Sequence, residues 1–204
     1  MVGSPRVRDI LSNTSDHWDD CCAEHMTVIV DTRRELGAVF EKAAVDIADA
    51  LARGGLLMLC GNGGSAADAQ HIATEFTVRF IKDRKALRAM ALATDSSTQT
   101  ATGNDLGFDK VFSRQVEAHG RPGDVLVGIS TSGNSPNVLA ALEAARAAGI
   151  VTVALTGAGG GKAAALADHL LAVPSRTTAR IQEMHILIGH AICGAVERRL
   201  GLAS

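Results

Sequence analysis

The sequence predicts an α/β protein with a doubly wound, flavodoxin-like, five-stranded parallel sheet, helices on both faces and added N-terminal helices. Two observations support this class. Short apolar runs, typical of buried parallel strands, alternate with segments of helical periodicity. Polar loops rich in glycine, serine and asparagine follow several of those runs. Because ligands of doubly wound sheets bind beyond the carboxyl ends of the strands, at a switch point, we expect the functional site at that edge.

The elements follow one another in a regular order. Two N-terminal helices are expected at about residues 4–30 and 32–53, where apolar residues recur at helical spacing until Gly54-Gly55. Strands are expected at residues 56–60, 89–93, 125–129, 151–155 and 170–173. Later helices are expected at about residues 66–80, 109–119, 136–148 and 178–200, with a short one after Gly161. The polar segment between residue 94 and Gly107 is expected to be irregular.

Length and composition narrow the function classes. The 204 residues suit one domain with one good core, and that core must use small aliphatic side chains, because only 3% of residues are aromatic. A net charge of −2 argues against nucleic acid or an anionic membrane surface as partner. No run approaches the roughly 20 apolar residues of a membrane helix. The four cysteines lack metal-knuckle or redox spacing, and a cytoplasmic protein is expected.

The first candidate site is the hydroxyl loop, residues 130–135, which joins a predicted strand to a helix that Pro136 would start. Ser130, Thr131, Ser132 and Ser135 offer hydroxyl donors beside the free amides of a helix N-terminus, where the dipole favours an anion. No lysine or arginine lies in the loop. Four hydroxyls exceed what one helix cap needs, so we interpret the loop as a phosphomonoester site. The alternative is a simple capped turn.

The second candidate is the glycine loop, residues 61–66, with the sequence Gly-Asn-Gly-Gly-Ser-Ala. It matches the G-x-G-x-x-A form of a dinucleotide fingerprint, but the acidic residue expected about 20 positions later is missing. Lys82 and Asp83 precede the next strand, and Asp95 comes too late. The glycines can instead let the backbone approach a smaller ligand, with Asn62 and Ser65 binding it. A purely structural tight turn is the alternative.

Two helices carry candidate acid/base groups. His71 and Glu75 lie four apart on the helix after the glycine loop, so they share a face. Such a pair can bind a divalent metal, act as acid and base, or form only a surface ion pair. On the last helix Glu183 lies on nearly the same face as His190, whereas Gln182 lies about 80° away from it. A lone histidine such as His190 is more often a core group than a ligand.

Taken together, these motifs resemble the sugar isomerase (SIS) domain family, and specifically the phosphoheptose isomerases, from about Leu56 to Glu197. The resemblance is carried by Gly61-Asn62-Gly63-Gly64-Ser65, Ala67-Asp68-Ala69-Gln70-His71, Gly103-Asn104-Asp105, the hydroxyl loop and Arg180-Ile181-Gln182-Glu183. It implies a ketose–aldose isomerase that converts sedoheptulose 7-phosphate to D-glycero-D-manno-heptose 7-phosphate through an enediol, the first step of nucleotide-activated heptose biosynthesis, for instance toward lipopolysaccharide. It also implies a homotetramer with sites at subunit interfaces, in which residues 1–53 serve the oligomer and residues 54–204 form the sugar-phosphate-binding core.

The resemblance also implies roles for single residues. Glu75 would be the catalytic base and His190 the acid. One Zn²⁺ per subunit would be held by His71, Glu75, Gln182 and His190. The substrate would be bound by Asn62, Gly63, Gly64, Ser65, Asn104, Asp105, Ser130, Thr131, Ser132, Ser135 and Gln182. Helix geometry alone favours Glu183 as the neighbour of His190, and the family pattern favours Gln182.

Two rival functions remain at this point. The first is a non-catalytic SIS-domain adaptor of a replication initiator, or a sugar-phosphate sensor, which resembles the chain around residues 179–185. The presence of His71, Glu75, Gln182 and His190 favours the enzyme. A nucleotide-dependent dehydrogenase is the second rival, and it lacks the acidic residue that the fingerprint requires.

Overall fold

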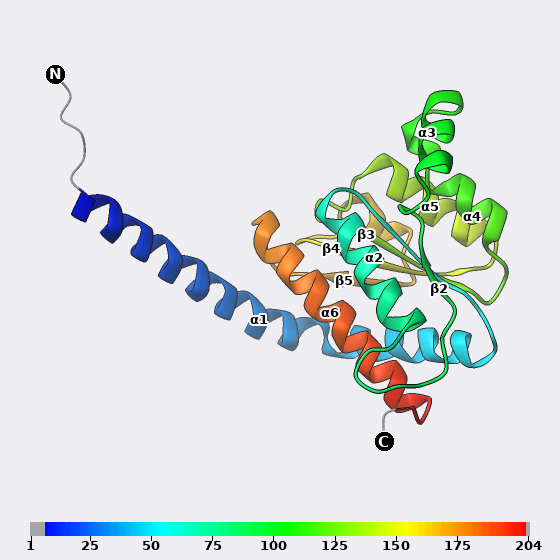
Figure 1. Ribbon diagram of the computed structural model, residues 1–204, viewed down its shortest axis with the longest axis horizontal. Coiled ribbons are helices and arrows are strands. Elements are labelled where there is room, and N and C mark those ends of the chain that lie inside the picture. The colour runs from blue at the N-terminus through cyan, green and yellow to red at the C-terminus, as the bar shows by residue number, and fades with distance from the viewer. Residues whose placement is uncertain (1–6, 203–204) are drawn as a thin grey trace.

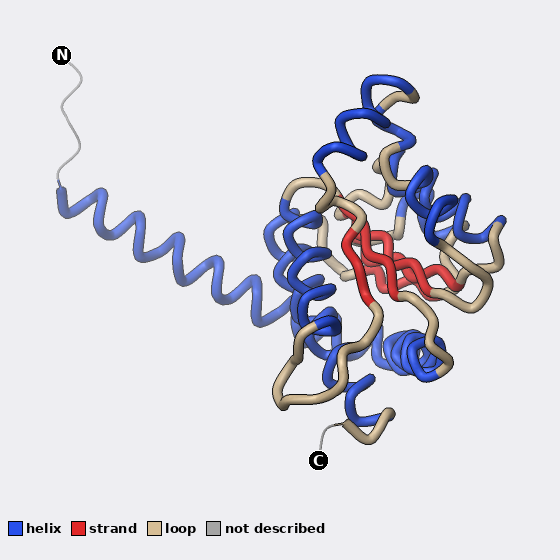
Figure 2. Tube along the Cα trace, turned by 45° about the vertical axis from the view of Figure 1, so that its right-hand side comes forward, coloured by secondary structure: helices blue, strands red, loops and turns tan. Residues whose placement is uncertain are grey.

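The parallel sheet that the sequence predicts is present in the computed structural model, which describes residues 7–202 (Figures 1 and 2). Its strands are β1 Leu57–Gly61, β2 Ala89–Ala91, β3 Val125–Ser130, β4 Val151–Thr156 and β5 His169–Ala172. They lie in the order β2-β1-β3-β4-β5. The predicted fold class is confirmed. After β1 the chain adds β2 on one side, and it then returns past β1 to add β3 on the other side. The strand order therefore reverses between β1 and β3, which is the switch point.

The helices cover both faces of this sheet. They are α1 Val7–Ala52, α2 Gly64–Thr77, α3 Ser96–Asp105, α4 Ser113–His119, α5 Pro136–Ala147 and α6 Thr178–Arg199, with short 3₁₀ turns at η1 Phe108–Lys110 and η2 Gly161–Ala165. Alternate residues of each strand face opposite sides. Leu57 and Leu59 of β1 therefore join one core with α1, α2 and α6, and Met58 and Cys60 join a second core with α4 and α5.

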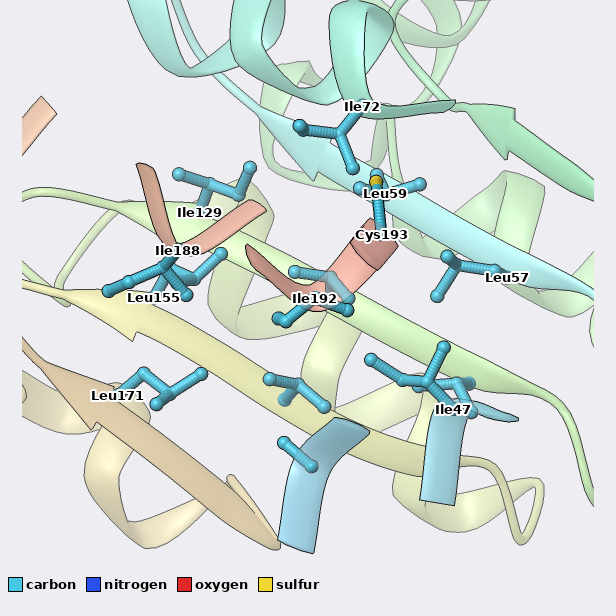
Figure 3. Packing of buried hydrophobic residues seen from close by; sticks show 14 of the residues in the cluster. Ile47, Leu57, Leu59, Ile72, Ile129, Leu155, Leu171, Ile188, Ile192 and Cys193 are labelled. Atoms are coloured by element: carbon cyan, nitrogen blue, oxygen red, sulfur yellow. The ribbon is translucent and has the colours of Figure 1, made fainter. Parts of the chain in front are cut away.

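Aliphatic side chains fill the first of these cores. Figure 3 shows Ile72 of α2, Ile188 and Ile192 of α6, and Leu155 and Leu171 of the sheet meeting in one cluster. This agrees with a composition poor in aromatic residues. Because protein interiors are close-packed, small changes in side-chain volume at the helix contacts of this cluster are expected to lower the stability of the fold.

The two predicted N-terminal helices are a single helix, so that prediction was wrong; residues 4–6 lie outside the described part. No glycine or proline separates the two predicted segments, and Asp31 forms a surface ion pair with Arg34, at 2.8 Å, instead of starting a new helix. Val28 is the first residue of α1 with a buried side chain among those described. The preceding part of α1 projects away from the sheet (Figure 1). None of the helices in residues 7–202 has an apolar stretch suited to crossing a bilayer.

The segment expected to be irregular contains α3, which is a second correction. Its ten residues bury only Thr102 and show no apolar period. The helix is started by Asp95, whose carboxylate accepts hydrogen bonds from the amides of Ser97 and Thr98 at 3.0 and 3.2 Å. Hydrogen bonds from the Thr98 side chain and backbone are the largest cause of a lowered pKa of Asp95. This capping role also removes Asp95 as a ribose ligand of a dinucleotide.

His185 is a buried histidine of α6, only 2% exposed. Its Nε2 lies 3.1 Å from the Thr156 carbonyl oxygen, and its Nδ1 has no partner among the described residues. Burial lowers the pKa of His185 to about 4, and the bond to Thr156 opposes this shift only in part. The imidazole is therefore a neutral core group.

We expect this histidine to make the fold acid-sensitive. An unfolded histidine has a pKa of about 6.5, so between that pH and about 4 the unfolded chain binds a proton that the folded chain does not. The contribution of neutral His185 to the free energy of unfolding is fully present above pH 6.5. It is lost as the pH falls to about 4, which lowers stability by about 3 kcal/mol. His185→Met should weaken this dependence, since Thr156 keeps its bond from the Val173 amide. Urea midpoints at pH 7 and 4.5 at fixed protein concentration measure it, and equal pH dependence in both proteins would contradict it.

Candidate active site

The glycine loop and the hydroxyl loop leave neighbouring strands at the switch point. β1 and β3 are paired so that Gly61 lies opposite Ile129, and each loop begins within one residue of that pair. Asn62 and Asn137 join the loops through two reciprocal amide hydrogen bonds of 2.9 and 2.8 Å. Asn137 is only 2% exposed, and the sequence reasoning missed it. The available signal was an amide in the first turn of an otherwise apolar helix.

The glycine loop turns directly into α2. Gly63 precedes the helix with a φ of 55°, a left-handed conformation that favours glycine. The Ser65 amide bonds back to the Asn62 carbonyl at 3.0 Å, and the Ser65 side chain is buried. Asn62, expected to bind substrate, uses one amide hydrogen on Asn137 and keeps one for a ligand.

Three hydroxyls of the second loop converge. Ser130 Oγ lies 2.9 Å from Ser135 Oγ and 3.4 Å from Ser132 Oγ. Ser135 occupies the N-cap of α5 but makes no side-chain capping bond. A side-chain cap therefore does not account for the Ser130–Ser135 contact, whereas Ser132 Oγ accepts a turn hydrogen bond from the Asn134 amide at 3.1 Å. Thr131 is half-buried, and its carbonyl accepts a hydrogen bond from the Gly157 amide. The loop presents neutral donors at a helix N-terminus, an arrangement that suits an anion.

A cluster of ionisable side chains lies where α2 packs against α6. The Nε2 atoms of His71 and His190 are 2.8 Å apart, and Glu75 Oε1 lies 3.4 Å from His71 Nε2. Donor atoms of all three residues lie within 4.8 Å of one another. At 2.8 Å the two ring nitrogens lie within hydrogen-bond distance of each other. The side chains of His71 and Glu75 are 51% and 19% exposed, so the cluster is open to solvent on its His71 side.

Two further residues shape this cluster, and neither was assigned a role from the sequence. The Phe80 ring stacks on the His190 imidazole, with centroids 5.6 Å apart and planes inclined by 22°. Asp68 lies one turn before His71. Burial raises the pKa of Asp68, while the nearby His71 and His190 act to lower it. Phe80 limits the orientations of the His190 ring, and Asp68 places an acidic group beside both histidines.

Gln182 and Glu183 point to different neighbours. Glu183, which helix geometry alone favoured beside His190, bonds His25 of α1 at 2.7 Å and Arg180 at 2.6 Å. Both of its carboxylate oxygens are thereby used. Helix geometry missed this because it ignored α1, which packs along α6 (Figure 1). Gln182 instead lies against the glycine loop.

Close approach of α2 to α6 depends on a glycine of α6. A Cβ on Gly189 would lie 2.6 Å from Ile72 Cδ1 of α2, well inside contact distance. A Cβ on Gly64 would lie 2.6 Å from Nε2 at the mobile end of the Gln182 side chain, which could move aside. The Gly189–Ile72 contact thus leaves little room for a side chain and helps set the separation of the helices that carry His71 and His190.

The expected pair Asn104 and Asp105 lies apart from the other candidates. Both are exposed at the end of α3, which projects from the body of the molecule (Figure 1). Asn104 Nδ2 donates to Asp105 Oδ1 at 2.7 Å. No hydrogen bond in the described part of the chain joins either residue to the hydroxyl loop or to the histidine cluster. Their predicted role in substrate binding remains a prediction.

Comparison with known proteins gives concordant results. The SIS domain family model matches residues 22–157. A phosphoheptose isomerase of Paramagnetospirillum magneticum is 54% identical over 179 residues, which cover 88% of this chain and 93% of that one. A phosphoheptose isomerase structure from Neisseria gonorrhoeae superposes with a TM-score of 0.84 at 47% identity, covering 93% of this chain and 99% of that one. One from Francisella tularensis gives 0.88 at 36% identity, covering 91% and 98%.

The close contact of Gly189 with Ile72 can be tested by a double-mutant cycle. Gly189→Ala should lower stability by about 1–3 kcal/mol, because the added methyl group overpacks the α2–α6 contact. In an Ile72→Ala background the nearest side-chain atom recedes to 3.9 Å, and the same change should cost much less. Urea unfolding of the four proteins measures the coupling. Equal costs of Gly189→Ala in both backgrounds would contradict it.

Proposed function

The chain belongs to the phosphoheptose isomerases, a family built on the SIS domain, and we propose that it interconverts sedoheptulose 7-phosphate and D-glycero-D-manno-heptose 7-phosphate at the switch point of its sheet. It is an isomerase. The observation that carries the assignment of the site is the cluster of His71, Glu75 and His190 at the junction of α2 and α6. An adaptor or sensor would need no such acid/base set.

The cluster offers the groups that ketose–aldose isomerisation needs. A base removes a proton from the carbon beside the carbonyl, and the resulting enediol takes a proton at the neighbouring carbon. We assign the base to Glu75. His190 would carry the hydroxyl proton between the two oxygens, since imidazole can both donate and accept near neutral pH. Stacking of the imidazole on Phe80 would hold the ring in place for this exchange.

The donor set also fits a zinc ion. Two imidazole nitrogens and a carboxylate oxygen converge within 4.8 Å, and nitrogen and oxygen ligands of this kind are typical of zinc. We propose that His71, Glu75 and His190 hold one Zn²⁺ per subunit, with Gln182 as a fourth ligand. When bound, the ion would polarise the oxygens of the substrate as a Lewis acid.

The hydroxyl loop would bind the phosphate at the other end of the sugar. Ser130, Ser132 and Ser135 converge beside the start of α5, and neutral donors at a helix N-terminus suit a phosphate. With Thr131, the glycine loop (Asn62, Gly63, Gly64 and Ser65) and Gln182, they would fix the substrate between phosphate and reacting carbons. Asn104 and Asp105 complete the proposed substrate-binding set.

Assembly and location extend the proposal. The part of α1 before Val28 projects from the sheet, and residues 14–20 of it are exposed. This part would pack against other copies in a homotetramer, with residues 1–53 serving the oligomer and residues 54–204 the core. A cytoplasmic location is supported by four cysteines that are all free thiols.

Both acid/base residues should be needed for chemistry and not for folding. Glu75→Gln and His190→Ala should each lower turnover of sedoheptulose 7-phosphate by roughly a hundredfold or more, the usual scale for a general acid or base. Aldose formation by the purified variants measures this, and the melting temperature serves as the control for folding. Metal analysis should also find less zinc in both variants, because each loses a ligand.

Wild-type turnover in either variant would refute its assignment. An inactive wild-type protein that binds no zinc and instead binds a partner protein would support the adaptor alternative.

The hydroxyl loop makes a separate prediction. Inorganic phosphate should compete with the sugar phosphate, and Ser132→Ala should weaken sugar-phosphate binding by about 1 kcal/mol, the scale of one hydrogen bond. Isothermal calorimetry with sedoheptulose 7-phosphate, with and without inorganic phosphate, measures the competition and the effect of Ser132→Ala. A titration of the wild-type protein with unphosphorylated sedoheptulose gives the comparison. Equal affinity of the wild-type protein for the two sugars would rule the phosphate site out.

A further inference from the structure

A buried ion pair joins the end of α2 to α6, away from the histidine cluster. Arg84, from the loop after α2, and Glu197 of α6 have side chains that are only 3% and 2% exposed. Arg84 Nε lies 2.7 Å from Glu197 Oε1, and the Phe80 amide donates to the same oxygen at 3.4 Å. The proposed chemistry does not use this pair, although burying two charges is costly.

Arg84 also closes the C-terminal end of α2. Its two terminal nitrogens donate to the carbonyl oxygens of Glu75 and Phe76, both at 2.7 Å. Carbonyls in the last turn of a helix lack intrahelical partners and form the negative end of the dipole, so a cation is favourable there. The planar guanidinium holds its donors in a fixed fork that meets both carbonyls and the Glu197 carboxylate, whereas an ammonium group is a compact charge without that fixed geometry.

The same pair connects the proposed base to the helix of the proposed acid. Glu197 follows His190 by seven residues on α6, so the two lie on nearly the same face. Cys193 lies between them. Burial raises the pKa of the Cys193 thiol to about 12, so this side chain is a neutral core group. Arg84 bonds both the Glu75 carbonyl and the Glu197 carboxylate, so the backbone of Glu75 and the side chain of Glu197 belong to one packed unit.

We propose that Arg84 and Glu197 are positioning residues of the isomerase: they fix the last turn of α2 on α6 so that the Glu75 carboxylate stays within proton-transfer reach of the substrate held at His190. This inference rests on the proposed function of Glu75 and His190. A displacement on the order of 1 Å far from the reacting atoms can lower a rate about a hundredfold. A purely stabilising pair would lower the melting temperature without a selective loss of kcat.

The test replaces the pair without leaving a buried charge. Arg84→Met combined with Glu197→Leu removes both charges and keeps apolar side chains of similar size, a change that proteins often tolerate. With sedoheptulose 7-phosphate we expect kcat to fall at least about tenfold. KM should change less than about twofold, because the hydroxyl loop belongs to β3 and α5 and loses no contact. Arg84→Lys keeps the charge opposite Glu197 but not the fork, and its kcat should lie between wild type and the double variant.

A control variant separates positioning from stability. Val116→Ala makes a cavity in the second core, on α4, and should lower the melting temperature while kcat stays at the wild-type value. Wild-type kcat in both Arg84 variants, or an equal loss of kcat in the Val116→Ala control, would overturn the inference. If the double variant does not fold, the kcat of Arg84→Lys tests the inference instead, and a wild-type value would overturn it. If the wild-type protein does not isomerise sedoheptulose 7-phosphate, the proposed function fails first and this inference fails with it.

Discussion

The close packing of α2 against α6 is the constraint on which the candidate site depends. The two helices are far apart in sequence, and every member of the histidine cluster comes from one of them. Two contacts restrain their separation: Ile72 with Gly189, and the Arg84–Glu197 pair. The histidine contact of 2.8 Å lies beside the first of them, and Gln182 reaches Gly64 at the start of α2. A side chain in place of Gly189, or loss of the ion pair, would change the helix separation without altering any residue of the histidine cluster.

The two ends of the proposed substrate are recognised by different chemistry. The cluster on α2 and α6 contains groups that titrate or bind metal, whereas the hydroxyl loop contains only neutral donors and backbone amides. A phosphate held by neutral donors does not bring an added positive charge close to the acid/base groups, and hydroxyl donors remain competent at any pH at which the fold survives. Protonation changes of the protein should therefore act on chemistry at one end, whereas at the anchor only the phosphate of the ligand titrates, with a second pKa of about 6.

The sequence predicted the sheet and both loops, because these depend on local patterns: apolar runs and small-residue loops after strands. Spacing on one helix marked His71 and Glu75 as a candidate pair, whereas the roles of His190 and Gln182 were implied by the family resemblance and remain predictions. Sequence reasoning failed where the deciding partner was distant in sequence. Glu183 is bound by His25, 158 residues away, and Asn62 by Asn137. Helix α3 was missed because a polar helix has no apolar period, although the Asp95 cap was a usable signal. The supposed break near Asp31 failed because an acidic residue inside a helix can pair with a basic one a turn later.

The topology explains why the two halves of the site face each other at all. After β1 the chain enters α2 on one face of the sheet, and after β3 it enters α5 on the other, since the connections from the two paired strands lead to opposite faces at the switch point. The glycine and hydroxyl loops therefore lead into helices on opposite faces of the sheet. The Asn62–Asn137 amide pair joins the two segments where they leave the sheet. In the proposed site, the phosphate anchor at the start of α5 and the acid/base cluster on α2 and α6 would thus be held by packed elements on both faces. A substrate would then be selected by whether its phosphate and its reacting carbons reach both groups together, since positioning depends on the two contacts at once.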